Sequence, residues 1–366
     1  MPERKARILR LSIPAGRRIL VISDAHANVP YLEGALRRAG FSDRDELILD
    51  GDFLEKGKES LRMLRIVMEL CRRGNTHALL GNCDEWSEIF SPDWPEAGDE
   101  HVLRYMLWRK SGLLWDMCND AGIDPFELED LQEAKALLKR RYAAEWDFLA
   151  ALPHAIETEH YLFTHAAVRP EKALEEHTAE DFTRCDHFLT QGCAFDKWVI
   201  VGHWPVVLYG EDRVCANPIV DREKKIVSID GGCVLKDDGQ LNCLIIPYNG
   251  SEDFGFVAYD PFPERVALDD QAESERSYYI RWGDSRVQVL RRGEEFSRCR
   301  HVRTGYEMDI LTKYLFTDND VTDCNDCTDY ILPVKAGDRL RIVEETSRGV
   351  FCKRGGVSGW YFGGLR

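Results

Sequence analysis

Short aliphatic runs alternate with longer amphipathic stretches over residues 18–250. Each run is a few residues long and rich in Val, Ile and Leu, which is typical of buried strands. The runs cover residues 18–22, 46–49, 77–80, 161–163, 198–201, 226–229 and 241–246. Strands separated by helical segments predict an α/β domain, placed here at residues 1–250, in which helices cover the sheets.

A helical insert interrupts this pattern at about residues 90–150. From about residue 98 onward, apolar residues recur three and four positions apart, as on one face of a helix. They include Leu131, Leu138, Tyr142, Trp146 and Leu149. The same segment contains Tyr105, Trp108 and Trp115. Large rings at helical spacing usually belong to a core, so we expect these three to be structural.

The chain changes character after Pro247. Residues 251–277 are polar, turn-rich and partly acidic, which predicts a linker. From residue 278 to 366 short strand-like runs dominate, and apolar and polar residues alternate over 285–290. This pattern predicts a small all-β domain, either a barrel or a sandwich.

Composition and charge narrow the classes of protein. The 366 residues carry a formal net charge of −16, which repels the phosphate backbone of nucleic acid. We find no apolar stretch long enough to span a membrane and no signal peptide at the start. We therefore expect a cytoplasmic protein with no nucleic-acid partner and no membrane partner. The 12 cysteines are irregularly spaced, and we expect them to be mostly reduced.

One cysteine pair has the spacing that zinc and redox sites use. Cys324 and Cys327 form a C-x-x-C segment, but no second pair or nearby histidine completes a tetrahedral set. We therefore do not predict a zinc site there.

Residue types that bind metals follow the ends of the predicted strands. They are Asp24, His26, Asp52, Asn82, His165 and His203. Open α/β sheets bind ligands at the carboxyl edge, so we expect these side chains to meet there. Asp24 and His26 are two positions apart on an extended segment and can bind one ion. The carboxylate of Asp52 can bridge that ion and a second one. Asn82, His165 and His203 then complete the second site.

The donor set limits the metal. Oxygen and nitrogen donors without thiolate suit Mn, Fe, Zn or related divalent ions better than a closed structural zinc site. We predict two divalent ions, with Mn as the first choice. Gly51, Gly81 and Gly202 stand beside the donors, where a missing side chain lets the backbone approach the ions.

These segments resemble the motifs of the calcineurin-like metallophosphoesterase superfamily, and specifically the bacterial form of its phosphoprotein phosphatase (PPP) branch. The matching segments are Asp24–His26, Gly51–Gly57, Gly81–Asp84, His165–Ala167, Gly202–Pro205 and Ser228–Cys233. The resemblance covers about residues 16–247. It implies a four-layer α+β fold, a β-sandwich flanked by helices, and two metals. It also implies in-line attack on phosphorus by a metal-bridging hydroxide.

Three positions depart from that branch. Cys83 replaces the histidine that protonates the leaving group in the family, Glu55 replaces the aspartate that orients it, and Lys56 replaces the phosphate-clamping arginine. Lys56 keeps the charge but loses the bidentate fork. The resemblance assigns phosphate binding to Lys56 and Asn82. A thiol beside two cations is a poor proton donor, so Asp84 is the alternative.

Several functions remain open at this stage. The first is a PPP-type phosphatase acting on phosphorylated protein. The second is a phosphodiesterase or dinucleoside-polyphosphate hydrolase acting on a small phosphoester. The altered proton donor predicts a preference for good leaving groups: aryl phosphates, diesters or phosphoanhydrides. The third is a metal-binding pseudophosphatase, disfavoured because all six predicted donors are present.

The C-terminal part resembles an SH3-like barrel. Residues 329–342 look like its opening segment and residues 359–365 like its last strand. Trp360 and Tyr361 either line a groove for a peptide partner or pack the barrel, and packing is the favoured interpretation.

Overall fold

The computed structural model describes residues 4–366, except for the side chain of residue 96. The contacts divide the chain into two compact units. The first comprises the residues up to Trp204, together with Pro218–Leu235 and Gln240–Asp260. The second comprises Pro205–Asn217, Lys236–Gly239 and Pro261–Arg366. The chain therefore passes between the units several times.

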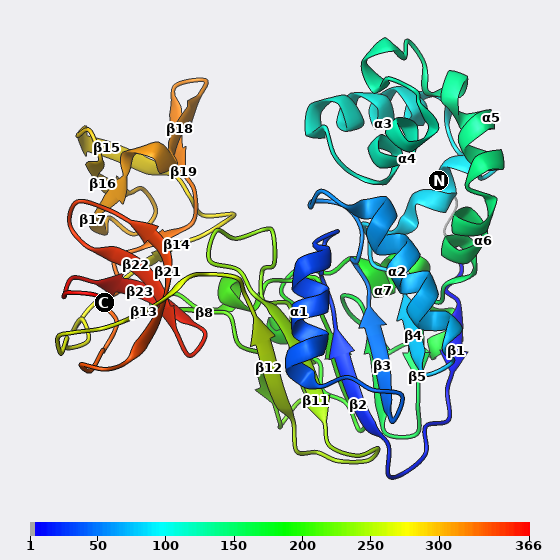
Figure 1. Cartoon of the computed structure of the whole chain (residues 1–366), viewed down its shortest axis with the longest axis horizontal. Helices are drawn as coiled ribbons and strands as arrows, with labels where there is room; N and C mark the ends of the chain where they lie inside the picture. The colour runs from blue at the N-terminus through cyan, green and yellow to red at the C-terminus, as the bar shows by residue number, and fades with distance from the viewer. Residues whose placement is uncertain (1–3) are drawn as a thin grey trace. The chain divides into compact units, whose positions relative to one another are not determined.

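Two sheets form the centre of the first unit (Figure 1). The five-stranded sheet has the order β12-β11-β2-β3-β4, with bounds Gly255–Tyr259, Leu241–Ile246, Arg18–Ile22, Asp45–Asp50 and Thr76–Leu79. The six-stranded sheet has the order β1-β5-β6-β7-β10-β9, with bounds Ile8–Arg10, Ala155–Glu157, Tyr161–Thr164, Trp198–Val201, Ile226–Ser228 and Ile219–Asp221. Strands β2, β3 and β4 are parallel, as are β6, β7 and β10.

The alternation along β2 explains how the sheets pack. Ile19 and Val21 join one buried cluster, which also contains residues of the six-stranded sheet. Leu20 and Ile22 join a second cluster, which contains residues of α1 (Val29–Ala39) and α2 (Ser60–Arg72). Successive side chains of a strand point to opposite faces, so one face of this sheet packs on its partner sheet and the other on helices. The predicted α/β arrangement, with helices covering the sheets, is present in this part of the chain.

The predicted helical insert is present. It consists of α3 (Glu96–Arg109), α4 (Leu113–Ala121), α5 (Leu131–Arg141) and α6 (Ala143–Ala151). The apolar residues picked out by their spacing between 131 and 149 are all buried. The expectation that Trp108 belongs to the core is wrong, because this residue is 72% exposed. Helical spacing predicts one face of a helix but not how far along that face the neighbouring elements extend.

Segment 251–277, predicted as a linker, contains two strands. Strand β12 extends the five-stranded sheet by pairing with β11, and β13 (Glu264–Val266) pairs with β21 in the second unit. The alternation in Gly255–Tyr259 is short and follows a polar turn, which conceals the strand in the sequence.

The second unit consists mostly of antiparallel strands, in agreement with the β-rich pattern. Its largest sheet has the order β13-β21-β22-β23-β8, where the last four are Arg339–Glu345, Val350–Arg354, Val357–Tyr361 and Val214–Cys215. Three smaller sheets complete the unit. One is three-stranded, with the order β15-β16-β17 and bounds Val287–Arg291, Phe296–His301 and Glu307–Leu311. The other two are pairs: β14 (Tyr279–Ile280) with β20 (Cys327–Thr328), and β18 (Leu315–Asp318) with β19 (Val321–Cys324). The SH3-like assignment stays a prediction.

Two sequence expectations for this unit can be compared with its side chains. Tyr361 is fully buried, and its hydroxyl donates to the carbonyl of Asp269 at 3.0 Å. It therefore packs the core of the sheet, as the favoured interpretation held. Cys324 and Cys327 are free, and their sulfurs lie 3.9 Å apart. Among the described residues, neither belongs to a cluster of three or more side chains that could hold a metal.

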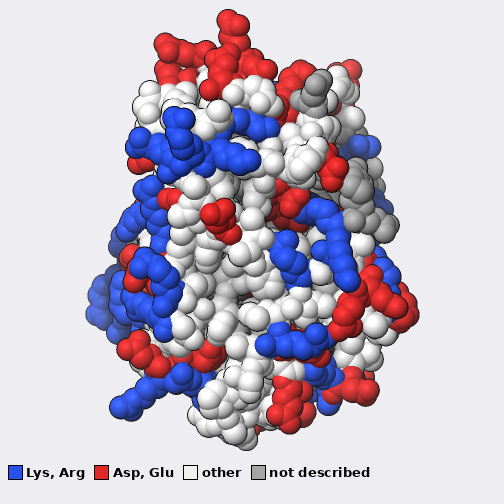
Figure 2. Space-filling view, turned by 90° about the vertical axis from the view of Figure 1, so that its right-hand side faces the viewer, with Lys and Arg blue, Asp and Glu red and all other residues white. Residues whose placement is uncertain are grey.

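Acidic and basic side chains are interspersed on the face shown in Figure 2, so the net negative charge does not form one uniform acidic surface there.

Among residues 4–366, every helix is too short or too polar to cross a lipid bilayer.

Candidate metal centre

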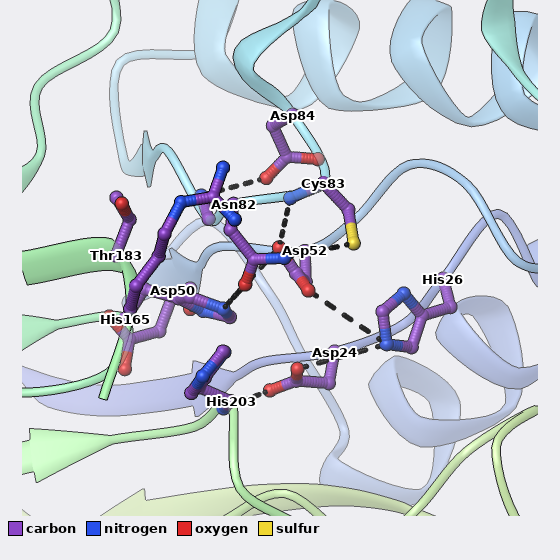
Figure 3. Close-up of polar contacts among 12 residues, drawn as sticks. Asp24, His26, Asp50, Asp52, Asn82, Cys83, Asp84, His165, Thr183 and His203 are labelled. Atoms are coloured by element: carbon purple, nitrogen blue, oxygen red, sulfur yellow. Dashed lines mark hydrogen bonds and ion pairs between the residues drawn. The ribbon is translucent and has the colours of Figure 1, made fainter. Parts of the chain in front are cut away.

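The six predicted donors gather at one edge of the two sheets (Figure 3). Asp24 and His26 follow β2, Asp52 follows β3, and Asn82 follows β4. His165 follows β6, and His203 follows β7. Strands β2, β3 and β4 run parallel in one sheet, and β6 and β7 run parallel in the other. Within each sheet the carboxyl ends therefore lie at one edge, and the two edges lie together at the cluster. The structure thus brings together side chains that are up to 179 positions apart in the chain, as shown by the contact of Asp24 with His203.

The backbone of these loops is held in an unusual conformation. Asp24, His26, Asp52 and His203 have φ angles of 55°, 45°, 49° and 65°. Non-glycine residues in this left-handed region each cost about 1–3 kcal/mol, and such strain clusters at functional sites. Four of the six predicted donors are in this region, as are Ala27, Glu55 and Lys56 of the same loops.

The three glycines beside the donors are needed for close approach. A Cβ at Gly81 would lie 2.1 Å from Oδ1 of Asp52, and one at Gly202 would lie 2.2 Å from Oδ2 of Asp24. A Cβ at Gly51 would lie 2.6 Å from Nδ1 of His165. No side chain could occupy these positions without moving a donor.

Asp52 belongs to two groups of side chains that could each hold an ion. The first group is His26, Asp52 and Cys83. Nε2 of His26 lies 4.0 Å from Oδ2 of Asp52 and 3.8 Å from Oδ1 of Asp24. Oδ1 of Asp24 is buried and has no hydrogen-bond partner. A buried carboxylate oxygen without a partner is a position that a cation would satisfy.

The second group is Asp52, His165 and His203. Nε2 of His165 lies 3.3 Å from Oδ1 of Asp52 and 3.3 Å from Oδ1 of Asn82. The ring of His203 lies edge-on to that of His165, with centroids 5.1 Å apart. The carboxylate of Asp52 therefore reaches both groups, as expected of a bridging ligand.

Backbone carbonyls orient two of the histidines. Nδ1 of His165 lies 3.0 Å from the carbonyl of Asp50, and Nδ1 of His26 lies 3.3 Å from the carbonyl of Leu54. When Nδ1 donates to a carbonyl, Nε2 carries the lone pair. With a metal ion bound, this tautomer would leave the Nε2 lone pairs of both rings free to bind the ion beside the Asp52 carboxylate.

The charges of the cluster favour a bound cation. Burial would raise the pKa of Asp52, but the charge of His165 and its hydrogen bond hold that pKa well below its usual range. Burial and the charge of Asp230 raise the pKa of Asp24 well above its usual range. Burial and the charge of His165 lower the pKa of His203 to about 3, which keeps this ring neutral. Neutral imidazole and closely spaced carboxylates are the donor chemistry of divalent ions.

Asp84, predicted as the alternative proton donor, is bonded to the backbone, and burial and the charge of Asp52 raise its pKa to about 8. It is fully buried, and its two oxygens accept the backbone N–H groups of Leu54 and Gly81, each at 2.9 Å. These bonds join the loop after β3 to the loop after β4. The carboxylate is thus occupied in fixing the two loops that carry Asp52 and Asn82.

Among the described residues, Glu55 and Cys83 form no hydrogen bond with each other. Its carboxylate accepts the backbone N–H of Leu113 at 2.7 Å and the hydroxyl of Tyr105 at 3.4 Å. Burial raises the pKa of Glu55 to about 7. The sequence suggested that Glu55 orients the proton donor, but its partners belong to the helical insert.

Cys83 and Lys56 both border the cluster. The thiol of Cys83 accepts a hydrogen bond from Nδ2 of Asn82 at 3.4 Å, while its backbone N–H donates to Oδ1 of Asp52 at 2.8 Å. Lys56 follows Glu55, and its charge acts on His26 and Cys83. Its backbone carbonyl accepts Nη2 of Arg109 at 2.7 Å.

One residue of the centre was missed from the sequence. Asp50 is fully buried, neither of its carboxylate oxygens has a hydrogen-bond partner, and burial raises its pKa to about 7. A signal was available, because Asp50 directly follows the buried aliphatic run 47–49, where burying a carboxylate is costly unless it serves the site.

Comparison with known proteins identifies the family. Residues 17–230 match the family of calcineurin-like phosphoesterases, which covers more than half of the chain. No curated protein matches. Similar solved structures include a putative diadenosine tetraphosphatase, at 19% identity over 70% of this chain and 99% of that one, with a TM-score of 0.43. Another is a protein serine/threonine phosphatase from Saccharomyces cerevisiae, at 10% identity over 71% and 85%, with a TM-score of 0.44.

A metallophosphoesterase from Sphaerobacter thermophilus is 18% identical over 67% of this chain and 89% of that one, with a TM-score of 0.39. The family match agrees with the order of the donor segments and with the arrangement of the two sheets. Members of this family are hydrolases that act on phosphoester bonds. The chain belongs to the calcineurin-like phosphoesterase family.

Proposed function

We propose that the chain hydrolyses phosphoesters at a centre of two divalent metal ions, with Mn as the first choice. The observation that carries this proposal is the position of Asp52, which is shared by two groups of donors. Asp24, His26 and Asp52 would hold one ion. Asp52, Asn82, His165 and His203 would hold the other.

The residues around the metal centre have separate roles. When bound, two divalent ions supply the Lewis acidity that lowers the pKa of water and polarises the phosphoryl group. The carbonyls of Asp50 and Leu54 fix the rings of His165 and His26. Lys56 supplies a positive charge for the substrate phosphate, and the amide of Asn82 supplies a hydrogen-bond donor. Without the fork of an arginine, Lys56 binds phosphate as a point charge.

The surroundings of Cys83 support good leaving groups. The thiol receives no hydrogen bond from Glu55, because Glu55 is bonded to the insert. Without the orienting carboxylate that the family places beside its proton donor, the thiol is poorly suited to protonate a strongly basic alkoxide. Aryl phosphates, diesters and phosphoanhydrides leave without that help. We therefore favour phosphodiester or phosphoanhydride hydrolysis, with PPP-type phosphoprotein phosphatase activity as the second candidate, supported by the order of the donor segments.

Hydrolysis of two chromogenic substrates tests this proposal. p-Nitrophenyl phosphate and its bis-ester are compared with added Mn²⁺, for the wild-type protein and for Asp52→Asn. We expect turnover of both substrates in the wild type and a loss of at least about 100-fold in Asp52→Asn. Asp43→Asn, at an exposed position, should retain full activity. Turnover that survives in Asp52→Asn would refute the assignment of the centre.

A further inference from the structure

Three aromatic rings form a continuous series beside the metal centre. They are Trp86, in the short helix η1 (Glu85–Phe90) after β4, and Tyr105 and Trp108, both in α3. The ring centroids of Trp86 and Tyr105 are 6.4 Å apart, and those of Tyr105 and Trp108 are 6.3 Å apart. Trp86 and Tyr105 are half-buried, whereas Trp108 is 72% exposed. The series therefore runs from the protein interior out to solvent.

Hydrogen bonds tie this series to the loops of the centre. The hydroxyl of Tyr105 donates to Glu55, three residues after Asp52. The backbone N–H of Trp86 donates to the carbonyl of Asp84 at 2.8 Å, two residues after Asn82. The rings thus begin at the two loops that carry Asp52 and Asn82.

Positive charges accompany the exposed end of the series. The guanidinium of Arg109 lies 5.7 Å from the ring centre of Trp108, and its Nη2 donates to the carbonyl of Lys56. Nε of Arg109 is buried and has no hydrogen-bond partner. Lys110 follows directly, with its amine 5.5 Å from the ring centre of Phe126. In a chain of net charge −16, this local row of cations beside exposed rings fits a ligand that is both aromatic and anionic.

We propose that Trp108, supported by Tyr105 and Trp86, is the stacking platform for the base of a nucleoside polyphosphate substrate. The phosphate chain passes Arg109 and Lys56 on its way to the centre. This inference rests on the proposed phosphoester hydrolysis and names its substrate class. Stacking on aromatic rings tolerates different bases, because every base has a π face.

The extent of the series favours a nucleotide over an aryl phosphate. In phosphotyrosine a single oxygen joins the ring to phosphorus, so the ring stays next to the centre. Trp108 is separated from the β4 loop by two successive ring spacings, of 6.4 and 6.3 Å. A ligand whose base is joined to the reacting phosphorus through ribose and further phosphates can span that length.

Kinetics with two substrates test the platform. The kcat/KM for diadenosine tetraphosphate and for p-nitrophenyl phosphate is measured in the wild type, Trp108→Ala, Trp108→Phe and Trp282→Ala. Trp282 is a matched control, because its ring is 60% exposed and lies outside the first unit. Stacking of one base is worth a factor of about 5 to 150 in affinity. We expect Trp108→Ala to lower kcat/KM for the dinucleotide by that factor, mainly through KM. Trp108→Phe should restore most of it, and p-nitrophenyl phosphate should be unaffected.

Quenching of tryptophan fluorescence by adenosine tetraphosphate gives a readout that does not depend on turnover. Quenching is expected in the wild type and in Trp282→Ala, and it should be largely lost in Trp108→Ala. If the protein hydrolyses p-nitrophenyl phosphate but Trp108→Ala changes neither the dinucleotide KM nor the quenching, the platform is refuted and the hydrolase stands. If quenching depends on Trp108 but no phosphoester is hydrolysed, the proposed function fails and nucleotide binding stands. A KM effect of Trp108→Ala confined to a phosphotyrosyl peptide would also overturn the nucleotide proposal.

Discussion

Glu55 accepts the backbone N–H of Leu113 at 2.7 Å, and this hydrogen bond joins the loop of Asp52 to the first turn of α4. A carboxylate at the start of a helix is favourable, because the first N–H groups lack partners within the helix and the helix dipole is positive there. The helical insert is therefore bonded to the metal-binding loop rather than merely packed near it. Substitutions in the helical insert should therefore alter the metal-binding loop.

Gly112 makes the contact between Glu55 and Leu113 possible. Its φ is +112°, and a Cβ there would lie 2.4 Å from Oε2 of Glu55. We predict that Gly112→Ala lowers the free energy of unfolding by about 2–4 kcal/mol, from backbone strain and displacement of the carboxylate. Gly122→Ala is the matched control, because Gly122 has a φ of +78° but open space around its Cβ, and it should lose only about 1 kcal/mol. Equal losses in urea denaturation would contradict the steric part of this account.

The ionisation of Glu55 should make stability depend on pH. Burial raises its pKa to about 7, above its ordinary value of 4.5, so the folded state holds the proton more tightly than the unfolded state. This contribution is fully present below pH 4.5 and is lost as the pH rises through 7. Between pH 5 and 8 the wild type should lose about 2–3 kcal/mol more than Glu55→Gln, whose amide cannot ionise but can still accept the Leu113 N–H. Parallel curves for the two proteins would show that Glu55 does not titrate in this range.

Asp84 is predicted to fix loops rather than to donate a proton. Asparagine offers one acceptor oxygen, so Asp84→Asn leaves the N–H of either Leu54 or Gly81 without a partner. We expect a loss of about 1–3 kcal/mol in unfolding free energy, together with weaker retention of metal. Asp93→Asn, at an exposed position, should change neither. Undiminished stability and metal content, together with turnover lost only for alkyl phosphates, would instead identify Asp84 as the proton donor.

Cys83 should determine which leaving groups are accepted. We predict that the wild-type rate falls steeply as the pKa of the leaving group rises, because the Cys83 thiol has no orienting carboxylate in Glu55 and is a poor proton donor. Cys83→His introduces an imidazole and should raise turnover of alkyl phosphates by about 10-fold or more, with little change for aryl phosphates. Cys83→Ser serves as a control for the change of side chain. A wild-type rate that is independent of the leaving group, or a Cys83→His protein that is slower on aryl phosphates without gain on alkyl ones, would contradict this view.

The sheets and the position of the donors could be predicted from the sequence, because both depend on local pattern. The aliphatic run 18–22 coincides with β2, and 198–201 coincides with β7. Asp24 and His203 each follow the carboxyl end of a strand, where ligands bind in open α/β sheets, so they could be expected to meet. Strands β2 and β7 lie in different sheets, and the packing of the sheets brings Oδ2 of Asp24 to the N–H of His203 at 3.0 Å.

The environment of the donors could not be predicted, because it depends on contacts between distant segments. Nothing local to Glu55 indicates that its partner is Leu113, 58 positions later. Likewise, the spacing of Trp108 fits a helix, but only the packing of the whole insert shows that its ring is exposed. The role of the buried Asp50 was not predicted, because the family motif that identifies this loop begins one residue later, at Gly51.

Metal content measured by elemental analysis tests the central claim most directly. The wild type, Asp52→Asn and the exposed control Asp43→Asn are each loaded with Mn²⁺, freed of excess ion and analysed. Because Asp52 reaches both donor groups, the account predicts about two metal ions per chain in the wild type and in Asp43→Asn, and loss of both ions in Asp52→Asn. A wild-type protein that retains no metal, or an Asp52→Asn protein that retains both ions, would contradict it.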